Sequence, residues 1–194
     1  MKTIKIFLNN LFGLSGYRIY KVDRSERSFG EGGKRPDLLN YICEFKDNIH
    51  GTWIDVGSGG WGSVGSYEEI RNAFKDTVTI RTLDLNGAAD IVCDITQSGL
   101  PANSLDGVFI FETLEHIPSP QKAIDEIYRI LKPGGLIIGS TPFFYELHGE
   151  DYGDYWRFTR QGIREMFKSF SSVDVRAFGR HELKPHHYGF VAIK

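Results

Sequence analysis

The sequence predicts one α/β domain built on a doubly wound sheet of seven strands, most of them parallel. From residue 52 onward, short apolar runs alternate with amphipathic helical stretches, which is typical of parallel strands joined by crossover helices. The first run enters a glycine-rich turn, and the last two strand candidates are joined without a helix between them. Because so short a link suits antiparallel pairing, we expect a C-terminal hairpin at the sheet edge.

The individual elements follow from local sequence patterns. Strand candidates are residues 52–56, 78–83, 90–93, 106–111, 136–140, 172–178 and 187–193, and helical candidates are 66–75, 120–131 and 160–169. A further helix is expected to begin near Pro36. Residues 107–111 form an apolar run that suits a strand buried on both faces. The Pro-Gly-Gly segment 133–135 is expected to end the helix before the next strand begins.

Composition excludes several classes of protein. At 194 residues, 41% of them hydrophobic, the chain suits one well-buried core rather than two full domains. A net charge of −2 offers no broad positive surface for a phosphate backbone, so no nucleic-acid partner is expected. Cys43 and Cys93 are not part of a C-x-x-C motif, which argues against a disulfide framework and a thiolate zinc site.

The N-terminal segment is expected to be an amphipathic helix. Apolar residues at positions 4, 7, 8, 11 and 12 recur with helical spacing. We expect residues 1–16 to dock on their own domain or on the second subunit of a homodimer, with membrane-surface contact as the alternative. No signal-peptide cleavage site follows and no run reaches the roughly 18 apolar residues of a membrane span, so a cytoplasmic protein is expected. Residues 18–34 form a loop or flap.

The glycine-rich turn at residues 57–62 suits a nucleotide. Gly57, Gly59 and Gly62 follow the spacing of the dinucleotide fingerprint only approximately, so a tight structural turn is the alternative. Asp55, Asp84 and Asp94 stand at the ends of three successive strands. Three carboxylates at one sheet edge favour a cationic ligand over a dinucleotide pyrophosphate. If no ligand binds there, the same aspartates would cap helices and turns.

Ordered motifs along the chain resemble those of class I S-adenosylmethionine-dependent methyltransferases, which have a Rossmann-like fold. The motifs are Ile-Asp-Val-Gly-Ser-Gly at 54–59, Ala-Asp-Ile-Val-Cys-Asp at 89–94, Ser-Leu-Asp-Gly-Val at 104–108, Leu-Glu-His-Ile-Pro at 114–118 and Arg-Ile-Leu-Lys-Pro-Gly-Gly at 129–135. Residues 154–159, Asp-Tyr-Trp-Arg-Phe-Thr, further resemble a type 11-like subgroup associated with polysaccharide or other glycan modification. One departure is Trp61, which stands where the family often has its third glycine.

The resemblance implies S-adenosylmethionine as the cofactor and a set of residues that bind it. The implied set is Asp55, Gly57, Ser58 and Gly59 at the methionine end, Asp84 and Leu85 near the ribose, Asp94 and Ile95 at the adenine, and Glu112 on the methyl side. It also implies a single methyltransferase domain over 1–194. This domain comprises N-terminal helices and flap (1–50), a cofactor-binding half (51–140), and a substrate loop with the terminal hairpin (141–194).

Candidate catalytic and substrate residues follow the fourth and fifth strands. His116 and His148 stand at the carboxyl edge of the sheet and are the candidate general bases for a hydroxyl acceptor, although a structural role suits His116 as well. Asp154, Tyr155, Trp156 and Arg157 are the candidate substrate residues, because aromatic faces suit a sugar and a guanidinium grips a carboxylate or phosphate. Alternatively, Tyr155, Trp156 and Phe158 anchor the loop in the core while Asp154 caps a turn.

The leading hypothesis is therefore methyl transfer to oxygen of a small-molecule or glycan acceptor. A nicotinamide-dependent oxidoreductase and a non-catalytic, partner-recruiting module are the alternatives. No metal is expected, since His181, His186 and His187 flank a turn without further ligands at a familiar spacing.

Overall fold

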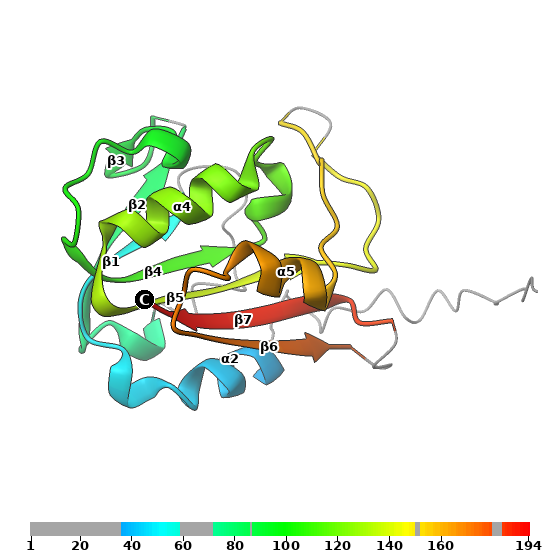
Figure 1. Cartoon of the computed structure of the whole chain (residues 1–194), viewed down its shortest axis with the longest axis horizontal. Coiled ribbons are helices and arrows are strands. Elements are labelled where there is room, and N and C mark those ends of the chain that lie inside the picture. The colour runs from blue at the N-terminus through cyan, green and yellow to red at the C-terminus, as the bar shows by residue number, and fades with distance from the viewer. Residues whose placement is uncertain (1–35, 59–71, 86, 150–151, 180–183) are drawn as a thin grey trace, which may run out of the picture.

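The computed structural model of the chain describes residues 36–58, 72–85, 87–149, 152–179 and 184–194 (Figure 1). The expected N-terminal helix, the loop at 18–34 and most of the helix expected at 66–75 lie outside these residues. Of that last helix, residues 72–74 are described and helical. Among the described residues, no helix has both the length and the apolar character needed to cross a bilayer.

Seven strands form one sheet in the order β3-β2-β1-β4-β5-β7-β6. They are β1 (Gly51–Val56), β2 (Val78–Asp84), β3 (Ile91–Val92), β4 (Leu105–Phe111), β5 (Leu131–Pro142), β6 (Ser172–Phe178) and β7 (His187–Ile193). Strands β1 to β5 pair in parallel, whereas β7 runs antiparallel to both β5 and β6. The predicted mostly parallel, seven-stranded sheet with a C-terminal antiparallel hairpin is confirmed.

Helices cover both faces of the sheet (Figure 1). The α-helices are α2 (Pro36–Cys43), α4 (Pro120–Ile130) and α5 (Arg160–Met166), and the 3₁₀ helices are η2 (Lys46–Asn48), η3 (Ile95–Gln97) and η4 (Leu114–His116). Successive side chains of a strand point to opposite faces. In β4, Val108 and Ile110 therefore join the core under α4 and α5, while Phe109 and Phe111 join the core with α2.

The Pro-Gly-Gly segment lies inside β5 rather than ahead of it. Helix α4 ends at Ile130, and Leu131 already pairs with Leu105. The next pair joins Gly107 to Leu136, so β5 advances five residues while β4 advances two. The segment is thus an irregularity within the strand, because the chain resumes sheet pairing before the helix-stopping residues rather than after them.

Helix α5 ends earlier than the expected residue 169. Thr159 caps its N-terminus, since the Thr159 hydroxyl accepts a hydrogen bond from the Gly162 amide at 3.1 Å, and the helix ends at Met166. The Phe167 amide still bonds to the Ile163 carbonyl, and the chain then turns into β6.

Gly107 of β4 allows the neighbouring strand to bury a tryptophan. It pairs with Trp53 of β1, a side chain with no exposed surface, and a Cβ at Gly107 would overlap the Trp53 indole. The indole packs on Phe109 at a centroid distance of 4.5 Å. The absence of a side chain at residue 107 is therefore a packing requirement of this core.

We expect Gly107→Ala to destabilise the fold by about 1–3 kcal/mol, because the added methyl group must displace the Trp53 ring. Urea denaturation followed by tryptophan fluorescence measures the change. Gly87→Ala is the matched control, since a Cβ there meets no atom within 4 Å. Equal midpoints for the two variants would contradict the packing argument.

Glu126 of α4 joins this helix to η3. Its carboxylate accepts hydrogen bonds from the Ser98 amide at 3.0 Å, the Ser98 hydroxyl at 2.6 Å and the Arg129 guanidinium at 2.7 Å. The bond from Arg129, with those from Ser98, lowers the pKa of Glu126 to about 2. Because the folded pKa lies below that of the unfolded chain, the charged form stabilises the fold at neutral pH.

We expect Glu126→Gln to destabilise the fold by about 1–3 kcal/mol at pH 7. The difference in unfolding free energy between wild type and variant should decrease as pH falls from about 4.3, the pKa of a glutamate in the unfolded chain, toward 2. Urea denaturation across this pH range measures it. In the control, Glu165→Gln removes an exposed carboxylate paired with Lys168, and a surface pair of this kind contributes little. A difference in unfolding free energy that does not change with pH would show that ionisation of Glu126 does not stabilise the fold.

Candidate functional site

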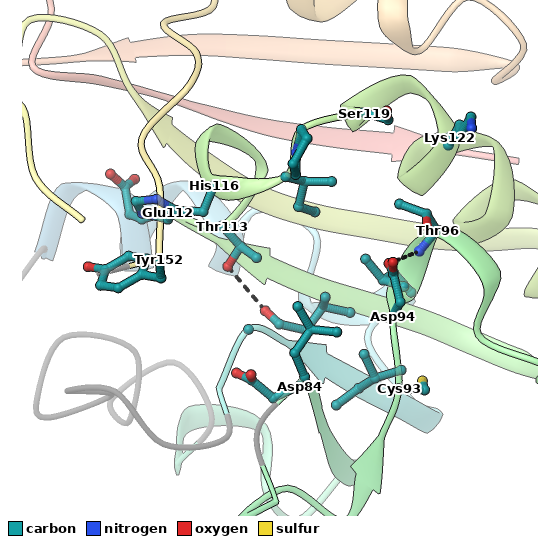
Figure 2. Close-up of a pocket in the computed structure, with 17 residues that line it drawn as sticks. Asp84, Cys93, Asp94, Thr96, Glu112, Thr113, His116, Ser119, Lys122 and Tyr152 are labelled. Atoms are coloured by element: carbon teal, nitrogen blue, oxygen red, sulfur yellow. Dashed lines mark hydrogen bonds between the residues drawn. The ribbon is translucent and has the colours of Figure 1, made fainter. Parts of the chain in front are cut away.

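A pocket of about 600 Å³ opens at the carboxyl ends of β1, β2 and β4. Its volume falls in the range of small-molecule and cofactor sites. It is lined by Val56, Gly57, Leu83, Asp84, Leu85, Cys93, Asp94, Ile95, Thr96, Glu112, Thr113, His116, Ile117, Pro118, Ser119, Lys122 and Tyr152. In Figure 2, Glu112, His116 and Tyr152 lie toward one end, and Cys93, Asp94 and Thr96 lie toward the other.

The end of β1 approaches the end of β4 closely. Gly57 has a φ of 81°, and a Cβ there would overlap the Thr113 side chain. The Thr113 hydroxyl lies 2.8 Å from the Phe111 carbonyl and 3.2 Å from the Val56 carbonyl, the contact drawn in Figure 2. Glycine is therefore required at residue 57 both for its backbone conformation and for the space that it leaves.

Not every residue predicted at this turn reaches the pocket wall. Asp55 is only 4% exposed and does not line the pocket, and the Ser58 hydroxyl donates to the Asp55 carbonyl at 2.8 Å. Gly59 lies outside the described residues, as does Trp61. The roles predicted for Asp55, Ser58 and Gly59 remain predictions.

The structure brings together the acids predicted at β2 and after β3. Asp84 and Leu85 form one wall, and Asp94 and Ile95 form the adjacent one. Asp94 also caps η3, since its carboxylate accepts from the Thr96 amide at 2.8 Å. A carboxylate has lone pairs for more than one donor, so a capping role and a ligand-binding role are compatible.

Glu112 lies in a strained backbone conformation at the pocket wall. Its φ is 45°, which non-glycine residues rarely adopt, and its carboxylate accepts from the Ser140 hydroxyl at 2.6 Å. The Glu112 amide also donates to the Ser140 carbonyl at 2.8 Å. These two bonds to β5 hold the turn, and strain of this kind is typical of functional sites.

The two candidate bases, His116 and His148, lie together. Their rings meet edge to face with centroids 4.9 Å apart, although only His116 lines the pocket. His116 Nδ1 bonds to the Gly153 carbonyl, and burial lowers the pKa of His116. Because a carbonyl only accepts, the proton of the neutral ring is on Nδ1, which leaves a lone pair on Nε2.

Glu115 is a buried acid that sequence analysis did not single out. It has no exposed surface, and neither carboxylate oxygen has a hydrogen-bond partner among the described residues. Burial, followed by the charge of Glu112, raises the pKa of Glu115 well above its usual value. Its position on η4 directly before His116 was the available signal, but a sequence does not show that the side chain turns inward.

The predicted substrate residues form a structure of their own beside the pocket. Asp154 and Arg157 pair through two hydrogen bonds, and this pairing lowers the pKa of Asp154 to about 2. Arg157 also donates to the carbonyls of Trp156 and Glu146. Its guanidinium is thus engaged within the chain, and its predicted grip on a substrate anion remains a prediction.

Phe158 does pack against the core, whereas Tyr155 and Trp156 are 54% and 43% exposed and so are not core residues. Neither lines the pocket, but Tyr152 does, with its ring 4.8 Å from that of His116. Sequence reasoning missed Tyr152, Thr113 and Lys122 as wall residues. Their nearness to the motifs was the only available signal.

Of the three histidines near the terminal hairpin, His181 lies outside the described residues. His186 and His187 are not among the residues that line the pocket. His187 stacks on Phe178 with centroids 5.4 Å apart, which places it in the packing of the hairpin.

Comparisons with known proteins agree with this geometry. Residues 55–139 match a family described as a methyltransferase domain. A ubiquinone biosynthesis O-methyltransferase from Vibrio atlanticus is 27% identical over 118 residues, which are 55% of this chain and 50% of that protein. A demethylmenaquinone methyltransferase from Symbiobacterium thermophilum is 30% identical over 142 residues, 70% of this chain and 47% of that protein. The chain thus spans about half the length of both relatives.

A solved structure has the same fold. The crystal structure of a SAM-dependent methyltransferase from Archaeoglobus fulgidus superposes with a TM-score of 0.62 at 18% identity, covering 82% of this chain and 92% of that one. The names of these relatives give no support to the glycan-modifying subgroup. The match over residues 55–139 and the shared fold support a methyltransferase domain of the class I, S-adenosylmethionine-dependent type in this chain.

Proposed function

We propose that the protein transfers the methyl group of S-adenosylmethionine to an oxygen atom of a small-molecule acceptor. The observation that carries the proposal is that the end of the pocket at Glu112 and His116 adjoins a second imidazole, His148. The other end, with Asp84, Asp94 and apolar Ile95, suits a nucleoside. The cofactor and an acceptor can therefore occupy adjoining spaces, as transfer requires.

The charge of the pocket suits this cofactor. Among the described residues that line it, three are carboxylates, Asp84, Asp94 and Glu112, and one is a cation, Lys122. S-adenosylmethionine carries a sulfonium and an ammonium group, which acids attract, whereas the pyrophosphate of a dinucleotide would be repelled. The β7 strand between β5 and β6 also departs from the strand order of dinucleotide-binding Rossmann domains. Both observations disfavour the nicotinamide-dependent oxidoreductase.

For this reaction the protein must position the acceptor oxygen against the methyl carbon and remove the hydroxyl proton. The acceptor oxygen attacks the methyl carbon in line, an O–C bond forms as the S–C bond breaks, and S-adenosylhomocysteine leaves. The hydroxyl proton must depart at or before this step. An imidazole of the His116–His148 pair accepts this proton. The name of the Vibrio relative, an O-methyltransferase, is consistent with an oxygen acceptor.

A glycan acceptor is the second candidate. Exposed aromatic side chains gather in the segment beside the pocket, namely Phe144, Tyr145, Tyr152, Tyr155 and Trp156. Aromatic faces next to polar groups suit sugar rings. The named relatives favour the small acceptor, and the acceptor assay below separates the two.

We expect Asp84→Ala to weaken the binding of S-adenosylhomocysteine about 10- to 100-fold, the loss typical of a charged hydrogen-bond partner. Isothermal titration calorimetry measures it, with NAD titrated in parallel. Asp76→Ala, which removes an exposed carboxylate away from the pocket, should bind as wild type does. Binding of NAD in place of S-adenosylhomocysteine would overturn the proposal. Binding without any transfer in the next assay would support a non-catalytic module.

We expect His148→Ala to lower methyl transfer about 100-fold or more while leaving S-adenosylhomocysteine affinity unchanged, because His148 lies outside the pocket wall. The assay supplies radiolabelled cofactor with separate small-molecule and glycan fractions of a cell extract. His50→Ala, an exposed histidine outside the site, is the control. If label enters only the glycan fraction, the acceptor is a glycan and not a small molecule. Full activity of His148→Ala would show that His148 has no catalytic role.

A further inference from the structure

Glu115, His116 and His148 bring one carboxylate and two imidazoles to a single point. One potential ligand atom from each residue lies within 4.8 Å of the other two. We propose that these three side chains bind one divalent transition-metal cation beside the methyl end of the pocket. The binding site stands on its own geometry, and its catalytic role rests on the proposed function.

Both imidazoles are oriented as metal ligands usually are. His116 donates its Nδ1 proton to the Gly153 carbonyl. His148 Nδ1 lies 3.2 Å from the Glu146 carbonyl and 3.4 Å from the Asp154 carboxylate, so its proton has two acceptors. Each Nε2 therefore carries a lone pair. Metal-binding histidines characteristically donate their other N–H to a carbonyl or carboxylate in this way.

A lone pair of His116 faces a buried carboxylate without a proton donor between them. His116 Nε2 lies 3.7 Å from Glu115 Oε1, and both Glu115 oxygens lack hydrogen-bond partners among the described residues. When Glu115 is ionised, these two groups are both acceptors, and they repel each other unless a cation lies between them. Ligand bonds of 2.0–2.1 Å at a tetrahedral angle separate two ligand atoms by roughly 3.4 Å, close to the observed gap.

The charge around the three residues suits a divalent ion. When Glu115 is ionised, as a metal ligand is, Glu112, Glu115 and Asp154 contribute three negative charges, and Arg157 contributes one positive charge that is bonded to Asp154. The Arg157 guanidinium makes no hydrogen bond to Glu115. The remaining charge of −2 is what a divalent cation balances, and it offsets the high free-energy cost of leaving a buried carboxylate unpaired.

The ligand set indicates the kind of metal and its role. Two imidazoles with one carboxylate suit zinc, manganese, iron or cobalt rather than calcium, and three protein ligands leave a coordination position open. His116 lines the pocket, so a cation bound there would lie at the pocket wall, beside the space proposed for the acceptor. A hydroxyl bound to the metal would lose its proton to solvent more readily, and the resulting oxygen would attack the methyl carbon as the S–C bond breaks. The histidines would then act as ligands rather than as the bases expected from the sequence.

Titration of tag-free, chelator-treated full-length protein with Co²⁺ tests the proposal, because cobalt bound by imidazoles has visible absorption bands. We expect one equivalent to bind to the wild type and to His50→Ala. His148→Ala and Glu115→Gln should bind Co²⁺ at least about 100-fold more weakly. S-adenosylhomocysteine binding, measured on the same samples, verifies that each variant is folded.

The outcomes separate this proposal from the proposed function. If the wild type binds S-adenosylhomocysteine but neither Co²⁺ nor Zn²⁺ at millimolar concentration, the metal site is refuted, Glu115 is held protonated, and the methyltransferase proposal stands. Equal Co²⁺ affinity in wild type and His148→Ala would refute it as well. If Co²⁺ binds as expected but the cofactor product does not bind, the metal site stands and the proposed function fails.

Discussion

Parallel pairing of β1 with both β2 and β4 is the constraint on which the site depends. In this register Val56 lies beside Leu83 on one side and Ile110 on the other, so three strands end at the same level. The residues that follow each strand are thereby brought to one edge, although they are separated by many positions in sequence. The approach of Gly57 to Thr113 closes this edge, and the pocket opens directly beyond it.

The segment from Glu112 to His116 concentrates the unfavourable features of the described structure. Glu112 has a strained backbone, and Glu115 is a carboxyl group buried without a hydrogen bond. Each feature lowers stability, by about 1–3 kcal/mol for the strain and more for an ionised buried acid. A fold maintains such a segment only when its surroundings over-determine it, as the two bonds between Glu112 and Ser140 do here. Unfavourable local features next to a pocket are characteristic of a site shaped for function.

The sheet could be predicted from sequence because its signals are local. Alternating apolar runs and helical stretches predicted a doubly wound, mostly parallel sheet. The short link before β7 predicted the antiparallel hairpin. The path of β5 through the Pro-Gly-Gly segment could not be predicted, because it depends on the pairing of Leu131 with Leu105 of β4, which is distant in sequence. Local propensity then yields to pairing between strands.

The site was only partly predictable for a similar reason. Asp84, Asp94 and Glu112 stand at strand ends, a position that sequence reveals, and all three line the pocket. Tyr152 and Glu115 were missed because their roles depend on how a long loop folds back. That loop is held by contacts between residues far apart in sequence, such as the bond from the Tyr155 amide to the Glu115 carbonyl. No local pattern encodes such a contact.

The Asp154–Arg157 pair shows how a residue chosen for its chemistry can serve another purpose. A fork-shaped guanidinium beside aromatic rings suggested a grip on a substrate anion. In the structure Arg157 holds Asp154, and the same Asp154 carboxylate accepts from the His148 amide at 3.0 Å. The ion pair therefore sets the position of His148 against His116. An arginine placed to bind substrate would have to release Asp154 first, and His148 would lose its support at the moment when the acceptor arrives. The geometry favours Arg157 as the residue that positions His148 through Asp154.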